Sequence, residues 1–333
     1  MRAFSDFGTP MLIGEGYRTF PVLIYTQFIS EVGGNSAFAI MAIIIALAIF
    51  LIQKHIANRY SFSMNLLHPI EPKKTTKGKM AAIYATVYGI IFISVLPQIY
   101  LIYTSFLKTS GMVFVKGYSP NSYKVAFNRM GSAIFNTIRI PLIALVLVVL
   151  FATFISYLAV RKRNLFTNLI DSLSMVPYIV PGTVLGIAFN TGLFGSGFLM
   201  ITGTAFILIM SLSVRRLPYT IRSSVASLQQ IAPSIEEAAE SLGSSRLNIF
   251  AKITTPMMLS GIISGVILSW VTMISKLSTS ILLYNVKTRT MTVAIYTEVL
   301  RGNYGVAAAL STILTVLTVG SLLLFMKISK SNR

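Results

Sequence analysis

Long apolar stretches, each close to the thickness of a bilayer, constrain this chain more than any other feature. A helix needs about 20 apolar residues to cross the hydrocarbon core. Only helices and closed barrels satisfy their backbone hydrogen bonds inside lipid. We therefore expect an all-α, polytopic transmembrane helical bundle with about 7–8 spans. The predicted spans are 36–53, 81–105, 136–160, 166–189, 198–214, 259–283 and 305–326.

The composition supports a membrane protein and excludes several kinds of site. Hydrophobic residues make up 54% of the chain and charged residues 11%, whereas soluble domains are about 25% charged. The chain has no cysteine, which excludes disulfides, thiolate metal ligands and a cysteine nucleophile. The two histidines, His55 and His68, stand in no metal-binding pattern, so we expect no metal site and no cofactor.

The basic residues predict an orientation. If the spans alternate, most basic clusters fall on one side, and lysine and arginine favour the cytoplasmic side. This pattern accounts for the net charge of +19 without a nucleic-acid partner. It places a loop at about 106–135 outside the cell and a long loop at about 215–258 inside. The clusters on the cytoplasmic side are Lys54 with Arg59, 73–79, 161–163, Arg215 with Arg216, Arg246 with Lys252, and 327–333.

An internal repeat indicates duplicated architecture. Residues 292–297 resemble residues 21–26 at an offset of 271 residues, and each segment precedes an apolar stretch. Repeats of domain length are typical of transporters built from two similar halves. Chance similarity between apolar segments is the alternative. We predict the tail of a first repeat at 1–60, a cytoplasmic linker at 61–79 and a complete repeat with six spans at 80–333.

A polar segment in the predicted inner loop favours a short helix outside the membrane. Ser234 and Glu237 have the spacing of a capping box. Ala238 and Ala239 are small, so they leave a face that another protein can approach closely. Gly243 is a suitable C-terminal stop. A second helical run is expected at 245–252, before Pro256, which gives a helix, a turn and a helix.

The spacing of this loop resembles that of permeases of binding-protein-dependent ABC importers. Those permeases, of the type I kind, carry Glu-Ala-Ala, three residues, Gly, nine residues, Ile, one residue and Leu-Pro. Thr255 replaces the usual leucine, which weakens one apolar contact. The resemblance implies that the loop is a coupling helix that docks in a groove of a cytoplasmic ATPase. The alternative is an ordinary capped amphipathic helix. The matching residues are Glu237, Ala238, Ala239, Gly243, Ile253 and Pro256.

Three further segments, 177–186, 215–222 and 5–10, resemble the ferric-iron branch of these permeases. The resemblance implies iron(III) as the cargo, with phosphonate, polyamine, sulfate and thiamine as alternatives. Members of that branch are often one long chain of two halves, each with its own coupling loop. This chain has one such loop, so we expect it to need a second permease half or a second copy.

Candidate residues for a translocation path lie in and after the interrupted spans. Ionisable residues at membrane depth are functional candidates. Lys276 either lines the path or extends to the outer interface, and Asp171 is expected near the cytoplasmic interface. Prolines and glycines either bend a pore-lining helix or allow close helix packing. The other candidates are Ser275, Ser278, Pro177, Pro181 and Gly182.

The family resemblance implies a multi-pass protein of the bacterial plasma membrane that works by alternating access. Its partners would be a cytoplasmic ABC ATPase dimer and an extracytoplasmic substrate-binding protein. The chain has no G-x-x-x-x-G-K-[ST] loop, so ATP would be bound by the ATPase partner. A secondary transporter or channel is one rival. A membrane enzyme is the other, although the nine carboxylates form no convincing acid–base pair.

Overall fold

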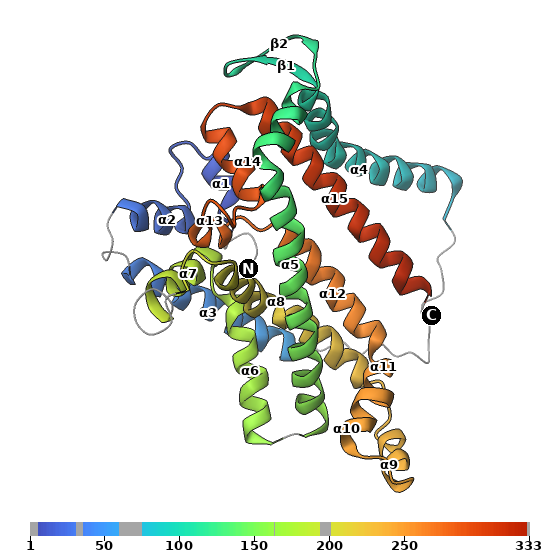
Figure 1. The fold of residues 1–333 in the computed structure, drawn as a ribbon. Coiled ribbons are helices and arrows are strands. Elements are labelled where there is room, and N and C mark those ends of the chain that lie inside the picture. Colours follow the sequence, from blue (N-terminus) through green and yellow to red (C-terminus); the bar gives the residue numbers. More distant parts are fainter. Residues whose placement is uncertain (1–5, 31–35, 60–74, 163, 194–200, 332–333) are drawn as a thin grey trace.

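The computed structural model describes residues 6–30, 36–59, 75–162, 164–193 and 201–331. Long helices run between two ends of the molecule, with a β-hairpin at one end and the short helices α9 and α10 at the other (Figure 1). The longest helix, α5 (Asn121–Arg161), connects these ends. Of the predicted 61–79 linker, all but its last five residues lies outside the described residues.

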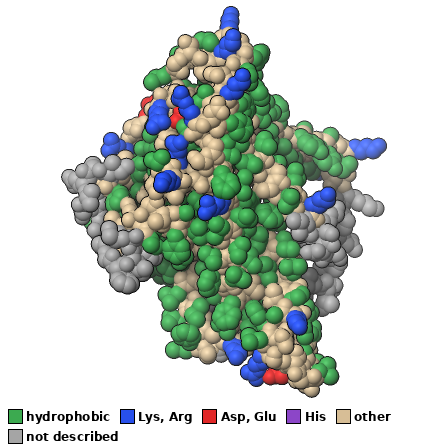
Figure 2. Space-filling view, viewed as in Figure 1, with side chains coloured by type: hydrophobic (Ala, Val, Ile, Leu, Met, Phe, Trp, Pro, Cys, Tyr) green, Lys and Arg blue, Asp and Glu red, His purple; other side chains and the backbone are tan. Residues whose placement is uncertain are grey.

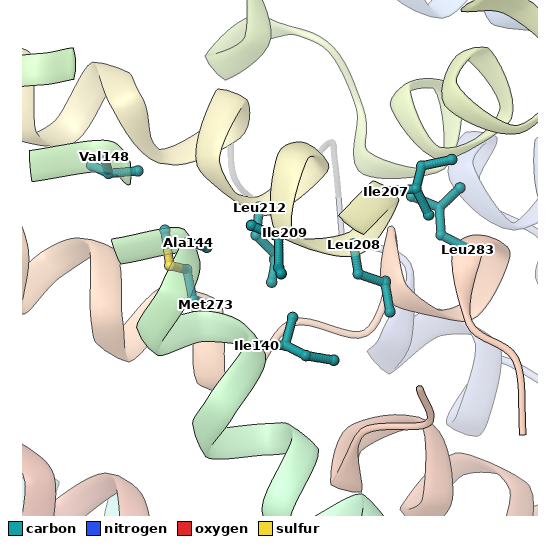
Figure 3. Packing of buried hydrophobic residues seen from close by; sticks show 9 residues of the cluster. All are labelled: Ile140, Ala144, Val148, Ile207, Leu208, Ile209, Leu212, Met273 and Leu283. Atoms are coloured by element: carbon teal, nitrogen blue, oxygen red, sulfur yellow. The ribbon is translucent and has the colours of Figure 1, made fainter. Parts of the chain in front are cut away.

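The centre of the bundle is formed by α5, α8 (Ala205–Leu228) and α12 (Leu259–Ile274). Their best-buried apolar cluster lies mainly between α5 and α8, with Met273 of α12 and Leu283 of α13 (Ser280–Leu283) beside it (Figure 3). Ser213 Oγ donates to the Ala144 carbonyl at 3.2 Å, which joins α8 to α5. Hydroxyls that bond backbone carbonyls allow polar residues to pack inside such a bundle.

Three helices in the described part of the chain are long and apolar enough to cross a bilayer: α4 (Lys77–Ser105), α5, and Tyr304–Lys327 of α15 (Tyr304–Ser331). Two bent helix pairs raise this number to at most five. The predicted count of about 7–8 spans is therefore not confirmed. Hydrophobic side chains cover much of the face in Figure 2, and basic side chains are prominent towards its upper and lower ends.

The predicted span at 166–189 is broken in the structure. α6 (Leu165–Ile179) and the run from α7 (Gly182–Ile187) through η1 (Ala188–Leu193) meet at 105°. Pro177 is accommodated inside α6, and the break falls at Val180, whose backbone is extended before Pro181. A residue before proline is biased away from the helical conformation, so Pro181 accounts for the position of the break.

The prediction for 198–258 is wrong in two respects. The helix begins at Ala205 rather than at 198, and it continues to Leu228 rather than ending before Arg215. Arg215 and Arg216 are consequently buried inside the bundle, not placed in a cytoplasmic loop. Arg216 Nη2 donates to the Thr272 carbonyl at 3.1 Å, a contact between distant segments that overrides the usual interfacial preference of arginine.

The expected external loop at 106–135 is largely structured. β1 (Leu107–Ser110) and β2 (Val113–Tyr118) form an antiparallel hairpin whose turn contains Gly111, with φ of +60°. α5 begins directly afterwards at Asn121. The prediction of an all-α chain therefore missed a small hairpin, although the molecule is otherwise helical.

The predicted span at 259–283 also ends early. α12 stops at Ile274, the chain is irregular through 275–279, and α13 follows. Sixteen residues of helix rise about 24 Å, less than the ~30 Å core of a bilayer.

A separate layer is formed by the N-terminal helices α1 (Gly8–Ile13), α2 (Phe20–Ser30) and α3 (Ser36–Arg59). α2 packs against α7, and its Tyr25 shares a buried cluster with Ile281 of α13 and Tyr296 of α14 (Met291–Leu300). The first 60 residues are thereby attached to elements from the other end of the sequence.

Candidate functional site: the protruding helix pair and a cavity in the bundle

The predicted helix–turn–helix is present at the end of the molecule opposite the hairpin (Figure 1). It consists of α9 (Ser234–Ser241), α10 (Arg246–Ile249), η2 (Phe250–Thr254) and α11 (Thr255–Met257). Gly243 has φ of +81°, a conformation that favours glycine. The Ser244 N–H donates to the Ala239 carbonyl at 3.0 Å and the Gly243 N–H to the Glu240 carbonyl at 2.9 Å. These paired bonds form a Schellman motif, so Gly243 ends α9 as predicted.

The predicted capping box at Ser234 is wrong. Pro233 occupies the N-cap position with helical dihedrals, so Ser234 lies inside the first turn and caps nothing with its side chain. A side-chain cap occurs one helix later, where Ser245 Oγ accepts from the Asn248 N–H at 3.4 Å. The second helical run also continues through Pro256 to Met257, because proline is tolerated in the first turn of a helical segment.

Glu236, which is not one of the residues of the family motif, fixes this unit to the bundle. Its Oε1 accepts from Arg161 Nε and from Thr254 Oγ1, both at 3.0 Å. Arg161 Nη2 also donates to the Ile231 carbonyl at 3.0 Å. The Arg161 and Glu236 side chains are only 12% and 14% exposed. One carboxylate thus joins α9 to the last residue of α5 and to the helix that leads into α12.

The outer side of this unit presents apolar residues to solvent. Leu242 and Leu247, on either side of the turn, are 89% and 80% exposed. Glu237 and Ala238 are exposed, while Ala239 and Ile253 are half-buried. The Glu240–Arg246 ion pair, at 3.0 Å, is exposed on both sides. We call residues 237–247 the knob: a small surface with two unburied leucines, joined to the bundle through Glu236.

A second candidate site is a cavity of about 420 Å³. Ser275, Lys276 and Ser278, three of the residues predicted for a path, line it from the irregular segment after α12. α1 and α14 supply the facing walls, including Tyr296. Thr292 Oγ1 donates to the Lys276 carbonyl at 3.1 Å, which fixes the segment against α14.

Pro177, Pro181 and Gly182 do not line this cavity. Gly182 lies directly behind it, where Thr279 Oγ1 donates to the Gly182 carbonyl at 3.2 Å. The glycine therefore serves close packing of α7 against 278–280. The side chain of Asp171 lies outside the described residues.

α14, which lines the cavity, is related by the sequence repeat to α2, whose Tyr25 packs in one cluster with Tyr296 of α14. α2 and α14 begin at Phe20 and Met291, which differ by the 271 residues of the repeat. Tyr25 and Tyr296 differ by the same offset, and both belong to one buried cluster. Two repeat-related helices therefore meet beside the cavity.

The described residues contain no group of three or more His, Asp or Glu side chains placed to hold a metal ion. A hollow of about 270 Å³ lies where the knob meets the end of α5. Two ion pairs line it, Arg161–Glu236 and Arg246–Glu240.

A membrane bundle with a helix pair standing out on one end is the architecture of a transporter's membrane subunit. Residues 154–330 match the family of binding-protein-dependent transport system inner membrane components, and the chain belongs to that family. The match includes the whole knob.

Curated relatives of this chain include ferric and sulfate permeases. The ferric transport system permease protein FbpB of Actinobacillus pleuropneumoniae is 29% identical over 341 residues, which cover 98% of this chain and 48% of that protein. The sulfate transport system permease protein CysT of Escherichia coli is 25% identical over 53% of this chain and 67% of that protein. This chain spans about half the length of the ferric-type relatives.

Among solved structures, the fold is similar to that of a bacterial ABC transporter involved in the import of the acidic polysaccharide alginate. The TM-score is 0.60 at 16% identity, over 76% of this chain and 96% of that chain. A second structure of such a transporter, in complex with a periplasmic protein that holds an alginate pentasaccharide, gives a TM-score of 0.58 at 17% identity, again over 76% of this chain and 96% of that chain.

Proposed function

We propose that the chain is a permease subunit of an ATP-driven importer and that the knob is its cytoplasmic docking element for a separate ATPase subunit. The observation that carries this proposal is the pair of exposed leucines, Leu242 and Leu247, on a unit that is otherwise fixed by Glu236. Exposed apolar groups beside small residues suit burial in a partner's groove.

The contacts of Glu236 provide a route for movement from the knob into the bundle. A displacement of α9 acts on α5 through Arg161 and on the helix leading into α12 through Thr254. α12 ends at Ile274, immediately before the cavity-lining segment. Approach of two ATPase subunits would in this way change the shape of the cavity and give alternating access.

The proposed path runs through the 420 Å³ cavity, with Ser275, Lys276 and Ser278 on its wall. Its position beside the repeat-related Tyr25 and Tyr296 agrees with transporters whose sites lie at the interface of two repeats. A second permease half or copy would complete the walls. The domain division at 1–60, 61–79 and 80–333 is part of this proposal.

We propose iron(III) as the cargo, on the basis of the ferric-type relatives. Sulfate and phosphonate are the main alternatives, because sulfate and 2-aminoethylphosphonate permeases are also similar to this chain. The partners would be an ABC ATPase dimer that binds ATP and an extracytoplasmic binding protein. The chain itself would hold no cofactor and would reside in a bacterial plasma membrane.

The test is loss of ATPase association on disruption of the knob. Deletion of residues 237–243, or Leu242→Asp, should abolish co-purification of the ATPase subunit, measured as ATPase activity bound to the tagged permease. Leu165→Asp is the matched control, because Leu165 is 91% exposed at the same end of the molecule but outside the knob. Association that survives the deletion contradicts the docking assignment, and transport without any ATPase subunit favours a secondary transporter.

A further inference from the structure

Arg215 is a buried arginine without a partner among the described residues. It lies near the middle of α8 and is only 5% exposed. Its Nη1 has no hydrogen-bond partner. Its neighbour Arg216 is equally buried but donates to the Thr272 carbonyl and lies 5.4 Å from the Tyr219 ring. Both guanidinium groups have a buried nitrogen without a partner, Nη1 in Arg215 and Nε in Arg216, but only that of Arg216 also donates a hydrogen bond.

Two further polar groups near the start of α7 also lack partners. A Cβ atom on Gly182 would lie 2.7 Å from Arg215 Nη1 and would overlap Ser278 Oγ, so both atoms approach the α7 backbone at the same point. Ser278 Oγ has no hydrogen-bond partner, and neither does Thr183 Oγ1 on the next residue of α7. A guanidinium and one hydroxyl with unused capacity thus meet at Gly182, and a second such hydroxyl stands on the residue after it.

Arg215 forms no ion pair within the described part of the chain, and the carboxylate that lies nearest to this region along the cavity wall is that of Asp6. The carboxylates that form ion pairs in the described part do so with Arg161, Arg246 and Arg301. An unpaired charge inside a membrane bundle is strongly unfavourable and marks a functional site by default. A guanidinium presents a planar set of donors that fits the oxygens of an oxyanion, and hydroxyls supply further donors.

Ser278 connects this cluster to the cavity. It lines the 420 Å³ space together with Lys276, and its Oγ lies beside the same glycine as the guanidinium. Movement of the irregular segment 275–279 would open Arg215 to that space. The segment is joined to α12, which the knob moves in the proposed mechanism.

We propose that Arg215, Ser278 and Thr183 form a binding site for an oxyanion on the translocation path. The inference rests on the proposed path and specifies its cargo. The oxyanion is either the solute itself or a ligand group on a metal complex. A bare trivalent cation would be repelled by the unpaired guanidinium, so a ferric cargo would pass as an oxyanion-bearing complex.

The test is anion binding to the full chain in lipid nanodiscs, measured by thermal shift and by isothermal titration calorimetry. The probes are sulfate, phosphate, citrate and ferric citrate, against chloride at equal ionic strength. Wild-type protein should show a saturable rise in melting temperature with at least one oxyanion and none with chloride. A response to ferric citrate alone assigns the group to a metal complex, and a response to sulfate or phosphate assigns it to a free oxyanion.

Matched variants locate the binding. Arg215→Gln should weaken it at least tenfold while leaving the ligand-free melting temperature unchanged or higher, because an unpaired buried charge is removed. Arg216→Gln should retain the affinity. Ser278→Ala and Thr183→Val, which keep the guanidinium, should each weaken binding several-fold, and these variants decide the matter if Arg215→Gln does not fold.

The proposal is overturned if no oxyanion gives a saturable shift, or if Arg215→Gln and Ser278→Ala bind as wild type does. The proposed function has a separate readout. Arg215→Gln should retain the bound ATPase subunit. If this variant loses anion binding but keeps the ATPase, the result bears only on the anion site of the path. If wild-type protein does not bind the ATPase, the result contradicts the proposed coupling role of the knob.

Discussion

A single carboxylate, that of Glu236, holds three segments of the chain together at the end of the molecule that carries the knob. Glu237, the motif residue next to it, is exposed and forms no described ion pair. The family motif therefore identifies Glu237, which is available to a partner, whereas its neighbour Glu236 anchors the unit. Charge-assisted hydrogen bonds in partly buried positions are stronger than exposed ion pairs, so the two glutamates have separable roles.

Glu236→Gln should loosen the knob. The substitution removes the charge that accepts from Arg161 and Thr254 and should cost about 1–3 kcal/mol. Hydrogen exchange of the 234–257 amides measures the effect as faster opening. Glu240→Gln is the control, because its pair with Arg246 is exposed and contributes under about 1 kcal/mol. Equal exchange in both variants would contradict the anchoring role of Glu236.

Gly243→Ala should fray the end of α9. An alanine at φ of +81° costs about 1–2 kcal/mol, and the Schellman bonds would weaken. We expect faster exchange at Gly243 and Ser244 and reduced ATPase association in the same preparation. Gly243→Asn should be milder, because asparagine adopts this conformation more readily. If alanine and asparagine behave alike, the left-handed turn is not what positions the knob.

At the scale of elements, close packing between α8 and α12 links the knob to the cavity. Ser223 Oγ donates to the Gly261 carbonyl at 2.7 Å, and Thr220 Oγ1 lies 3.1 Å from Ser269 Oγ. Small residues allow helix backbones to approach closely inside a membrane. No bulky apolar side chains separate α12 from α8 at these contacts, so α12 can move against α8.

Gly265→Val should separate these two helices. A Cβ at this position would lie 2.6 Å from Thr220 Cα, which is backbone and cannot rotate away. Overpacking of this kind costs roughly 1–3 kcal/mol and should lower the melting temperature and transport together. Gly320→Val on α15 is the control, because a Cβ added at Gly320 would meet no atom within 4 Å. Unchanged stability in Gly265→Val would show that α8 and α12 are not in this close contact.

The local part of the structure followed from sequence, and the long-range part did not. The turn at Gly243 was predictable because glycine spacing and helix signals act within a few residues. The capping box at Ser234 failed because Pro233 already adopts helical dihedrals. The burial of Arg215 and Arg216 had no local signal, since basic residues usually mark an interface and the Thr272 carbonyl comes from a distant helix. Pro177 and Pro181 indicated an interrupted span, but only tertiary packing shows that it turns through 105°.

At the scale of the whole molecule, the proposed mechanism joins the two candidate sites. The knob lies at one end and the hairpin at the other (Figure 1). α12 ends at Ile274, directly before the segment that lines the cavity. This mechanism requires that Leu242 face the cytoplasm and that Met112, in the hairpin turn, face outside. Orientation is thus the property on which docking, coupling and the direction of transport all depend.

Single-cysteine labelling tests this orientation directly, because the chain contains no cysteine of its own. Leu242→Cys and Met112→Cys variants would be treated with a membrane-impermeant maleimide in right-side-out vesicles, before and after permeabilisation. We expect Met112→Cys to react at once, and Leu242→Cys to react only after permeabilisation and to be protected by bound ATPase subunit. Reaction of Leu242→Cys in sealed vesicles, or no reaction after permeabilisation without the ATPase, would contradict the proposed mechanism.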